Sequence, residues 1–295
     1  MQRILFFLLI LVVVTSGCVA GGGGAGVIIE NFAPDFSSVF IEEDVNFRVK
    51  IKNAGSVDSP GGKVKILGMD DWGGGTGGAG GAGECTYTGK LLAAQPSFGT
   101  TGEVLVCDPF TFKAPKVPQG LPVTYQPTAR LSYSYGSSIV KTLTLASQQE
   151  LRRIENLGGA LPAETTAVSS SPVTINVLTK GPIRVFTNGV KFPIEITVAN
   201  TGGGVVCKGD HTACDTNDNW NRISITTTIG GKEESGCSKP DLTLFRGQSN
   251  SITCQVQLSI PQGGGILQKT IQVEASYGYF VDRLTTVTVN WRDIT

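Results

Sequence analysis

The side chains best suited to chemistry gather in one short stretch of the sequence, between Cys207 and Trp220. This stretch holds two of the cysteines and His211, the only histidine of the chain. It also holds an oxygen-rich run from Asp215 to Asn219. Histidine activates nucleophiles, cysteines pair as disulfides outside the cell, and alternating oxygen ligands are typical of calcium loops. Catalysis, cross-linking and cation binding therefore all have to be weighed here first.

The oxygen-rich run resembles the start of a calcium-binding loop. Asp215, Asn217 and Asn219 carry oxygen ligands at alternating positions. Trp220 stands where an EF-hand needs glycine, and Thr226 stands where it needs a bidentate glutamate, so that form is excluded. An irregular calcium site of the kind found in surface β-sandwiches stays open beside a plain turn whose side chains bond their own backbone. We predict that calcium or a protein partner contacts the three alternating residues and Trp220.

Catalytic groups are scarce in the chain. His211 lies inside a short ring bounded by two cysteines, where we expect a solvent-facing loop residue rather than a general base. The adjacent carboxylates Asp70 and Asp71, and likewise Glu233 and Glu234, diverge on a strand or turn, whereas acid–base pairs must converge. The sequence therefore predicts that the protein is not an enzyme.

The N-terminal residues decide on which side of a membrane the chain folds. Arg3 precedes an apolar run from Ile4 to Val14, which is followed by small residues and then by glycines. This layout is typical of an export signal. At about 1.5 Å per residue the run spans roughly 17 Å, against about 30 Å of hydrocarbon, so a cleaved signal fits better than a permanent span. We expect an extracytoplasmic body at the cell surface.

Ser16 and Gly17, directly before Cys18, resemble the lipobox of bacterial and archaeal lipoproteins, in which the cysteine is lipidated and becomes the new N-terminus. Thr15 departs from that motif, which usually carries an aliphatic residue there. The resemblance implies a membrane anchor through lipid at Cys18, followed by a flexible glycine tether. An ordinary secretory signal cut nearby and an uncleaved N-terminal anchor stay open as alternatives.

The number of cysteines agrees with this anchor. Seven cysteines in an exported chain leave one unpaired, and lipid at Cys18 would account for it. The other six can pair without crossing between the halves of the chain. The predicted disulfides are Cys85–Cys107, Cys207–Cys214 and Cys237–Cys254. Zinc is disfavoured, because the chain has no C-x-x-C pair and a single histidine.

An internal repeat organises the rest of the sequence. Apolar and polar residues alternate from Val45 to Lys52, and the strand stops at Asn53-Ala54-Gly55. The same alternation, from Lys191 to Val198, stops at Asn200-Thr201-Gly202. The two cysteine pairs outside the short ring fall at equivalent points of the two copies. We therefore predict a duplicated domain.

The ends of the copies also match, with one difference between them. Inward positions from Ala129 to Tyr135 align with those from Ile271 to Tyr277, and each copy then runs into Tyr-Gly, with the last strand following at once. The second copy needs twelve more residues between its Asn-x-Gly turn and the next strand, and these bring the stretch from Cys207 to Trp220. Loops at the end of a rigid sandwich often bind, so recognition is expected there.

The predicted fold class is all-β, with two tandem immunoglobulin-like β-sandwich domains after an N-terminal signal and lipobox segment. Each copy holds about seven short strands separated by turn residues, which is typical of such sandwiches. The copies resemble the broad group of prokaryotic surface Ig-like modules, including the cell-adhesion-related domains of archaea and bacteria, whose strands often end in a similar Asn-x-Gly turn. The resemblance implies no catalytic residues.

A short helix and a linker are expected between the copies. Ser147 to Asn156 is the only convincing helical stretch, with Ser147 and Glu150 at capping-box spacing. The predicted organisation is signal, lipobox and glycine tether in 1–26, first sandwich in 27–146, helix and linker in 147–172, and second sandwich in 173–295.

Composition narrows the function. A formal net charge of zero and only 16% charged residues argue against nucleic acid as a partner. The predicted function is a non-catalytic, membrane-anchored surface lipoprotein, an adhesion, envelope or accessory-binding module with a protein or glycan partner and no cofactor besides calcium. One alternative is a filament subunit that assembles by strand exchange. Another is a carbohydrate-binding or accessory domain of a surface enzyme complex, with Tyr279 and Phe280 as its outward aromatics.

Overall fold

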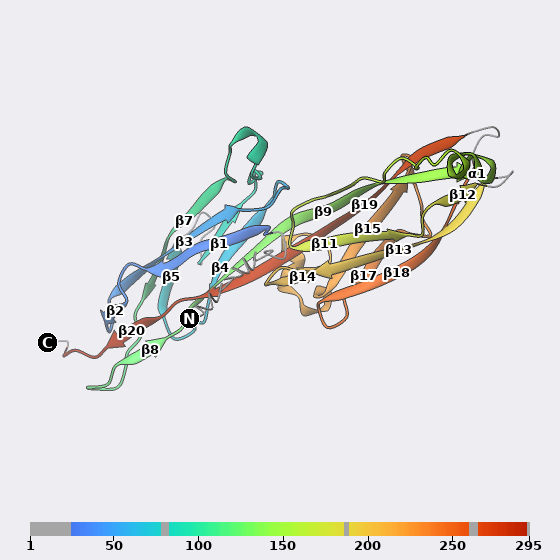
Figure 1. Ribbon diagram of the computed structural model, residues 1–295. Coiled ribbons are helices and arrows are strands. Elements are labelled where there is room, and N and C mark those ends of the chain that lie inside the picture. Colours follow the sequence, from blue (N-terminus) through green and yellow to red (C-terminus); the bar gives the residue numbers. More distant parts are fainter. Residues whose placement is uncertain (1–24, 78–82, 186–188, 260–264, 294–295) are drawn as a thin grey trace, which may run out of the picture.

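Two long strands, β9 (Thr128–Ser147) and β19 (Ile266–Leu284), run through the whole molecule. Every residue of β19 faces a partner on β9, so the two form one continuous antiparallel ribbon. Figure 1 shows a β lobe at each end of this ribbon, and the narrow region between them is called the waist here. The computed structural model describes residues 25–77, 83–185, 189–259 and 265–293.

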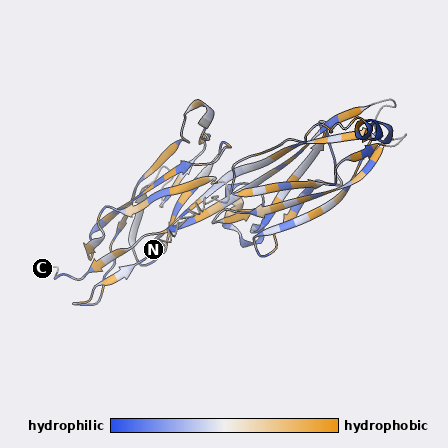
Figure 2. Ribbon diagram, in the orientation of Figure 1, coloured by the Kyte–Doolittle hydropathy of each residue, from blue (hydrophilic) through white to orange (hydrophobic). Residues whose placement is uncertain are grey.

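Sequence alternation explains how one strand serves two lobes. Side chains of a strand point to opposite faces in turn, and the buried positions of β9 keep the same parity on both sides of Gly136. Its buried residues include Ala129, Leu131, Tyr133, Tyr135, Ser137, Ile139, Leu143 and Leu145. Figure 2 shows the same alternation of hydrophobic and hydrophilic residues along strands of both lobes. The predicted inward faces of these strands are confirmed.

The predicted end of each penultimate strand at Tyr-Gly is wrong. β9 passes straight through Gly136 and β19 passes straight through Gly278. Neither glycine has a positive φ, so neither makes a turn. Gly136 lies opposite Ser276, and Gly278 lies opposite Ser134, in the middle of the ribbon. In each copy the penultimate and last strands are therefore one continuous strand at this point, and the two continuous strands pair with each other.

Most of the first lobe comes from the N-terminal half of the chain. One of its sheets has the order β1-β3-β7-β5, and the other continues the ribbon through β4 and β6. A small sheet, β2-β20-β8, closes the free end of the lobe. The elements are β1 (Val27–Pro34), β2 (Ser38–Phe40), β3 (Asp44–Asn53), β4 (Gly62–Leu67), β5 (Gly73–Gly77), β6 (Glu84–Tyr87), η1 (Pro96–Phe98), β7 (Val104–Lys113), β8 (Val123–Tyr125) and β20 (Val287–Asn290).

The second lobe repeats this plan. Its first sheet has the order β11-β13-β18, and its second continues the ribbon through β15, which pairs with β16 and β17. The remaining elements are α1 (Gln148–Asn156), β10 (Thr166–Val168), β11 (Val173–Thr179), β12 (Ile183–Val185), β13 (Val190–Asn200), β14 (Val205–Cys207), η2 (His211–Asp215), η3 (Asn217–Asn219), β15 (Arg222–Ile229), β16 (Lys232–Glu233), β17 (Lys239–Thr243) and β18 (Ser249–Leu258). The all-β, sandwich-like fold class is therefore as predicted.

Each copy places its last strand in the lobe of the other copy. In the first lobe β2 pairs in parallel with β20, the last strand of the second copy. In the second lobe β12, the equivalent of β2, pairs in parallel with the end of β9, the last strand of the first copy. The strand pairing therefore does not follow the predicted division into residues 27–146 and 173–295, because the two copies exchange strands reciprocally.

Both copies contain the same asparagine–tyrosine joint, and that joint corrects the predicted alignment. In the first copy the Tyr135 hydroxyl donates to Asn53 Oδ1 at 3.3 Å, and in the second the Tyr279 hydroxyl donates to Asn200 Oδ1 at 2.9 Å. Each Asn Nδ2 also donates to a carbonyl four residues further on. Tyr135 therefore corresponds to Tyr279, two residues beyond the Tyr277 that the sequence alignment selects.

The segment between the copies contains the predicted helix and an additional strand. Ser147 caps α1 by accepting a hydrogen bond from the Glu150 N–H at 3.2 Å. Figure 2 shows a mostly hydrophilic helix in this view, and none of its residues is buried. The linker after it is not a free spacer, because β10 pairs with β9 along residues 139–141. Among the described residues, no helix is long and apolar enough to cross a membrane.

The three disulfides join the predicted pairs of cysteines. Cys85–Cys107 links β6 to β7 across the first sandwich, and Cys237–Cys254 links the segment before β17 to β18 in the second. Cys207–Cys214 closes the short ring at the waist. Three disulfides indicate that the chain folds in an oxidising, extracytoplasmic environment.

Candidate functional site

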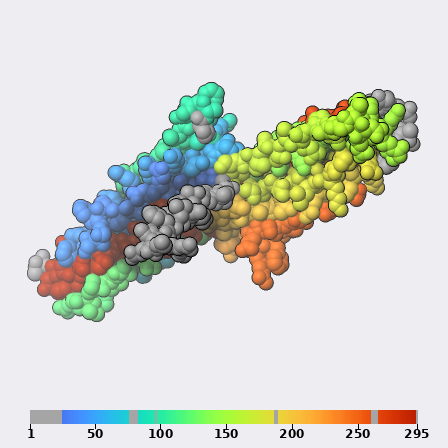
Figure 3. Space-filling view, in the orientation of Figure 1, coloured from blue at the N-terminus to red at the C-terminus, as the bar shows by residue number. Residues whose placement is uncertain are grey.

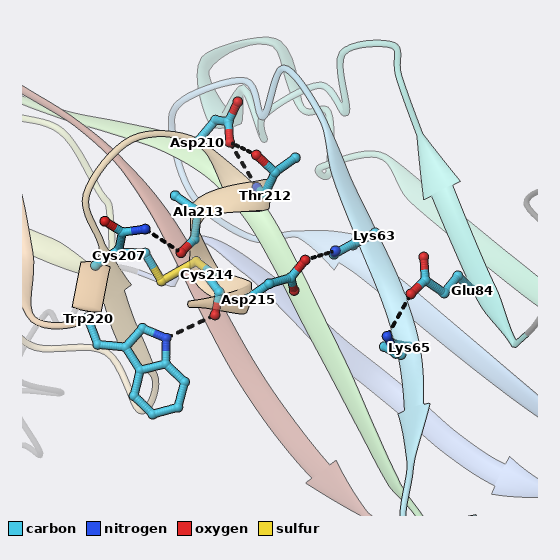
Figure 4. A network of polar contacts seen from close by, with 11 residues as sticks. Lys63, Lys65, Glu84, Cys207, Asp210, Thr212, Ala213, Cys214, Asp215 and Trp220 are labelled. Atoms are coloured by element: carbon cyan, nitrogen blue, oxygen red, sulfur yellow. Dashed lines mark hydrogen bonds and ion pairs between the residues drawn. A yellow bond between two sulfur atoms is a disulfide. The ribbon is translucent and has the colours of Figure 1, made fainter. Parts of the chain in front are cut away.

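The insertion of the second copy folds against the waist of the molecule (Figure 4). We call residues 207–220 the stapled loop. β14 leads into it and pairs with β19 at residues 278–280, and η2 and η3 complete it. Its location differs from the expected one, since it lies over the ribbon between the lobes and not at a free end of a sandwich.

The stapled loop satisfies much of its own hydrogen bonding. Asp210 Oδ1 caps η2 by accepting from the Thr212 N–H at 2.9 Å and from the Thr212 hydroxyl at 2.6 Å. The hydrogen bond from the Thr212 hydroxyl lowers the pKa of Asp210. Trp220 Nε1 donates to the Cys214 carbonyl at 2.9 Å, and Asn219 Nδ2 donates to the Ala213 carbonyl at 3.2 Å. Together with the disulfide, these bonds fix the shape of the loop.

His211 attaches the loop to β9. The Ser134 hydroxyl oxygen accepts from the His211 backbone N–H at 3.0 Å and lies 3.0 Å from His211 Nδ1, to which it can donate. The imidazole is half-buried, and this burial lowers its pKa. The prediction of a solvent-facing histidine is therefore wrong. Among the described hydrogen bonds none joins His211 to a carboxylate, so the contact docks the loop and does not form a Ser-His-Asp triad.

Asp215 connects the loop to the first lobe. Its carboxylate lies 2.5 Å from Lys63 Nζ on β4, and the Lys63 side chain is largely buried at 14% exposure. Lys65, on the same strand, pairs with Glu84 at 2.9 Å, as Figure 4 shows. The ion pair between Lys63 and Asp215 therefore joins the first copy to the insertion of the second.

The backbone of the ribbon also touches the loop. A Cβ on Gly278 would lie 2.2 Å from the Asp210 carbonyl oxygen and 3.0 Å from Cys214 Sγ. No side chain fits in this space, so glycine is required at position 278 for close approach rather than for a turn. The role of this glycine was not apparent from the sequence, because the contacting atoms lie more than sixty residues away.

Aromatic packing completes the contact. The Trp220 ring lies 5.1 Å from the Phe280 ring, and the Arg130 guanidinium lies 4.3 Å above the same phenylalanine. Arg130 is held by Asp282 through two hydrogen bonds, at 2.8 Å and 2.7 Å. Phe280 is only 4% exposed and Tyr279 only 1%. The prediction that these two aromatics face outward is therefore wrong.

The four residues predicted to contact calcium or a partner lie close in sequence but do different things. Asp215 pairs with Lys63, Asn219 bonds within the loop, and Trp220 packs on Phe280. Asn217 is exposed. The described part of the chain contains no group of three or more His, Cys, Asp or Glu side chains arranged to hold a metal ion.

A cluster of four buried tyrosines lies on the face of the ribbon opposite the loop. Tyr133 and Tyr135 come from β9, and Tyr277 and Tyr279 come from β19. The rings of Tyr133 and Tyr279 lie 5.6 Å apart across the ribbon, and burial raises the pKa of Tyr135 to about 12. Ser137 Oγ lies 2.7 Å from the Tyr277 hydroxyl and donates to the Val173 carbonyl. The waist is therefore a packed core and not a cleft.

Comparison with known proteins identifies no family for this chain. No protein-family model and no curated protein sequence matches the chain. Among solved structures, the transglutaminase of red sea bream is matched with 11% sequence identity and a TM-score of 0.20. That match covers 89% of this chain and 31% of the transglutaminase.

Proposed function

We propose that the protein is a non-catalytic surface lipoprotein, in which lipid at Cys18 holds a rigid two-lobed module outside the cell for adhesion, envelope organisation or accessory binding. The oxidised cysteines support an extracytoplasmic site. The apolar segment before Ser16-Gly17-Cys18 supports export and lipidation.

A binding or structural role is supported by the contacts of the stapled loop. Its histidine, its tryptophan and the carboxylates of Asp210 and Asp215 are bonded within the loop or to the rest of the chain. Catalysis needs such groups to converge on a space that a substrate can enter. In this protein they stiffen the junction of two β lobes, which is the property that a spacer or a display module needs.

The anchor is tested by detergent-phase partitioning and intact-mass measurement of the mature protein. Wild type is expected in the detergent phase with the mass of a lipid-modified Cys18, and Cys18→Ser is expected in the aqueous phase or unprocessed. Ser16→Ala keeps a small residue before the cysteine and serves as the matched control. A mature N-terminus beyond Cys18 without added acyl mass would refute the lipid anchor.

The filament alternative is weakened by the exchange of strands within the chain. Each lobe already holds the last strand of the other copy, so the position that a neighbouring molecule would fill is occupied by β20 in one lobe and by β9 in the other. We therefore propose a monomeric module in solution. Sedimentation analysis of the Cys18→Ser protein tests this, and a concentration-dependent ladder of oligomers would favour the filament.

Calcium binding remains a second proposal for the stapled loop, and Lys63 would compete with the cation for the Asp215 carboxylate. A cation that used the Asp215 carboxylate would have to displace Lys63 from it. Calorimetric titration of calcium into wild type and Asp215→Asn tests the site. Heat that appears in wild type and is lost in the variant would support calcium, and equal traces would remove it.

A further inference from the structure

The N-terminal tether joins the folded body at the waist. The Gly26 carbonyl accepts a hydrogen bond from Ala54 N at 2.9 Å. A Cβ on Gly26 would lie 2.6 Å from the Tyr133 hydroxyl of the ribbon and 3.0 Å from Pro172, just before β11. The chain therefore emerges between the two lobes and not at either end of the molecule.

The tether has a fixed maximum length. Residues 18–26 contain eight peptide steps, and an extended chain spans at most about 3.3–3.6 Å per residue. A lipid at Cys18 can therefore lie no more than roughly 28 Å from Gly26. An uncleaved N-terminal segment anchored through Ile4–Val14 would leave only a few more residues.

Each half of the molecule is longer than this tether. From Tyr135 the ribbon continues along β9 to Ser147, which at about 3.3 Å per residue corresponds to roughly 40 Å. In the other direction, β19 and β20 continue from Tyr277 to Asn290, again roughly 40 Å at the same rise. An end-on arrangement would hold the waist at least that far from the bilayer, which exceeds the reach of the tether.

We infer that the anchored protein lies side-on to the membrane, with the waist facing the lipid surface and both free ends projecting along it. This orientation rests on the proposed anchor at Cys18. The sheets that start at the waist are compatible with a lipid surface, because the charge there is small and positive: Glu30 lies 2.8 Å from Lys50 and 3.7 Å from Lys52. A neutral or mixed headgroup layer therefore meets no strong repulsion.

The orientation specifies the kind of partner that the module can reach. β1 and β11 both begin at the waist and run outward into opposite lobes, so the two free ends point away from each other (Figures 1 and 3). Ends that lie along the membrane meet other envelope components in the same plane, rather than a surface across a gap. The inference therefore favours envelope organisation over outward adhesion among the roles proposed above.

Energy transfer to a membrane dye tests the orientation with the full mature protein. Vesicles of phosphatidylcholine and phosphatidylglycerol would carry a headgroup acceptor dye, and a donor would be attached through p-azidophenylalanine. The donor replaces exposed Leu121, before β8 at the free end of the first lobe, or Arg152 of α1 at the free end of the second. A third donor at exposed Ser170 marks the waist.

Side-on binding predicts efficient and roughly equal transfer from both ends. A matched variant with twenty Gly/Ser residues inserted between Gly24 and Ala25 should release the ends and lower their transfer severalfold. Efficient transfer from one end with loss of transfer from the other would mean an end-on molecule and would overturn the inference while leaving the anchor intact. Failure of the wild type to bind vesicles, as for Cys18→Ser, would overturn both the anchor and the orientation.

Discussion

The two copies build the same joint at the waist, and only the second adds a loop that packs on the ribbon there. In both, the asparagine that ends β3 or β13 bonds a tyrosine of the ribbon and a carbonyl four residues ahead. The first copy continues directly from Asn53 into a short connection to β4. The second inserts the stapled loop, which reaches back to Ser134 and Lys63 of the first copy.

This difference separates two structural tasks, which are closing each sandwich and joining the two copies. The Asn–Tyr joint belongs to the repeat, because it occurs in both copies and closes each sandwich. The stapled loop belongs to the assembly, because two of its polar partners, Ser134 and Lys63, lie in the other copy. A symmetric pair of lobes is therefore held by a symmetric ribbon and stiffened by one asymmetric contact. The following predictions test which of these parts holds the molecule together.

The largest effect is expected from the two equivalent disulfides. Each of the double variants Cys85→Ser/Cys107→Ser and Cys237→Ser/Cys254→Ser opens a loop of similar length, with sequence separations of 22 and 17. Each should lower the free energy of unfolding by about 3 kcal/mol in the chain-entropy model. Because β9 and β19 belong to both lobes, calorimetry should show a single transition at a lower temperature. Two separate transitions would mean that the lobes fold independently.

A second prediction contrasts the two glycines of the ribbon. Gly278→Ala would place its Cβ against the Asp210 carbonyl and should cost about 1–3 kcal/mol by overpacking. Gly136→Ala is the matched control, since its Cβ would meet nothing closer than 3.5 Å, and its stability should stay within about 1 kcal/mol of wild type. Urea denaturation measures both. Equal losses would mean that the stapled loop is not docked on β19.

A third prediction concerns the joint that both copies share. Tyr135→Phe and Tyr279→Phe each remove the hydroxyl that donates to an asparagine oxygen of the joint, which is buried at Asn53 and partly buried at Asn200, so each should cost about 1–2 kcal/mol. A loss confined to one variant would show that the repeat does not use both joints alike.

The raised pKa of Tyr135 predicts that stability depends on pH in the alkaline range. Burial raises the pKa of Tyr135 from 10.0 to about 12, so the unfolded chain loses this proton before the folded chain does. Stability should therefore fall as pH rises from 10 towards 12, and Tyr135→Phe should reduce the slope. Absorbance titration of the phenols at alkaline pH checks the assignment.

The smallest effect is expected from His211. Burial lowers its pKa from 6.5, and Lys63 also disfavours its charged form, while Asp210 and Asp215 favour it. The unfolded chain therefore takes up this proton first, and stability should fall as pH drops below about 6.5. Because the chain has no other histidine, His211→Gln should remove this component from the pH profile of unfolding between 5 and 7. An unchanged profile would show that His211 does not contribute through Ser134.

Local patterns in the sequence predicted the strands, the helix and the disulfides of the lobes. The alternation from Val45 to Lys52 and its repeat predicted buried strand faces, because the period of a strand is two and one face must leave water. Capping-box spacing predicted the helix after Ser147, because a cap acts within one turn. The spacing of the cysteines predicted all three disulfides, because the repeat places two of the pairs at equivalent points and the third pair is close in sequence.

Only the tertiary structure decided how the copies are connected and what the stapled loop does. A Tyr-Gly step is compatible with a turn or with a continuous strand, and pairing partners more than a hundred residues away select the strand. The contacts of His211 and Asp215 with Ser134 and Lys63 likewise join distant segments, so no local pattern marks them. Periodicity therefore determined which residues are buried, whereas long-range pairing determined that the two copies exchange strands and that the insertion joins them.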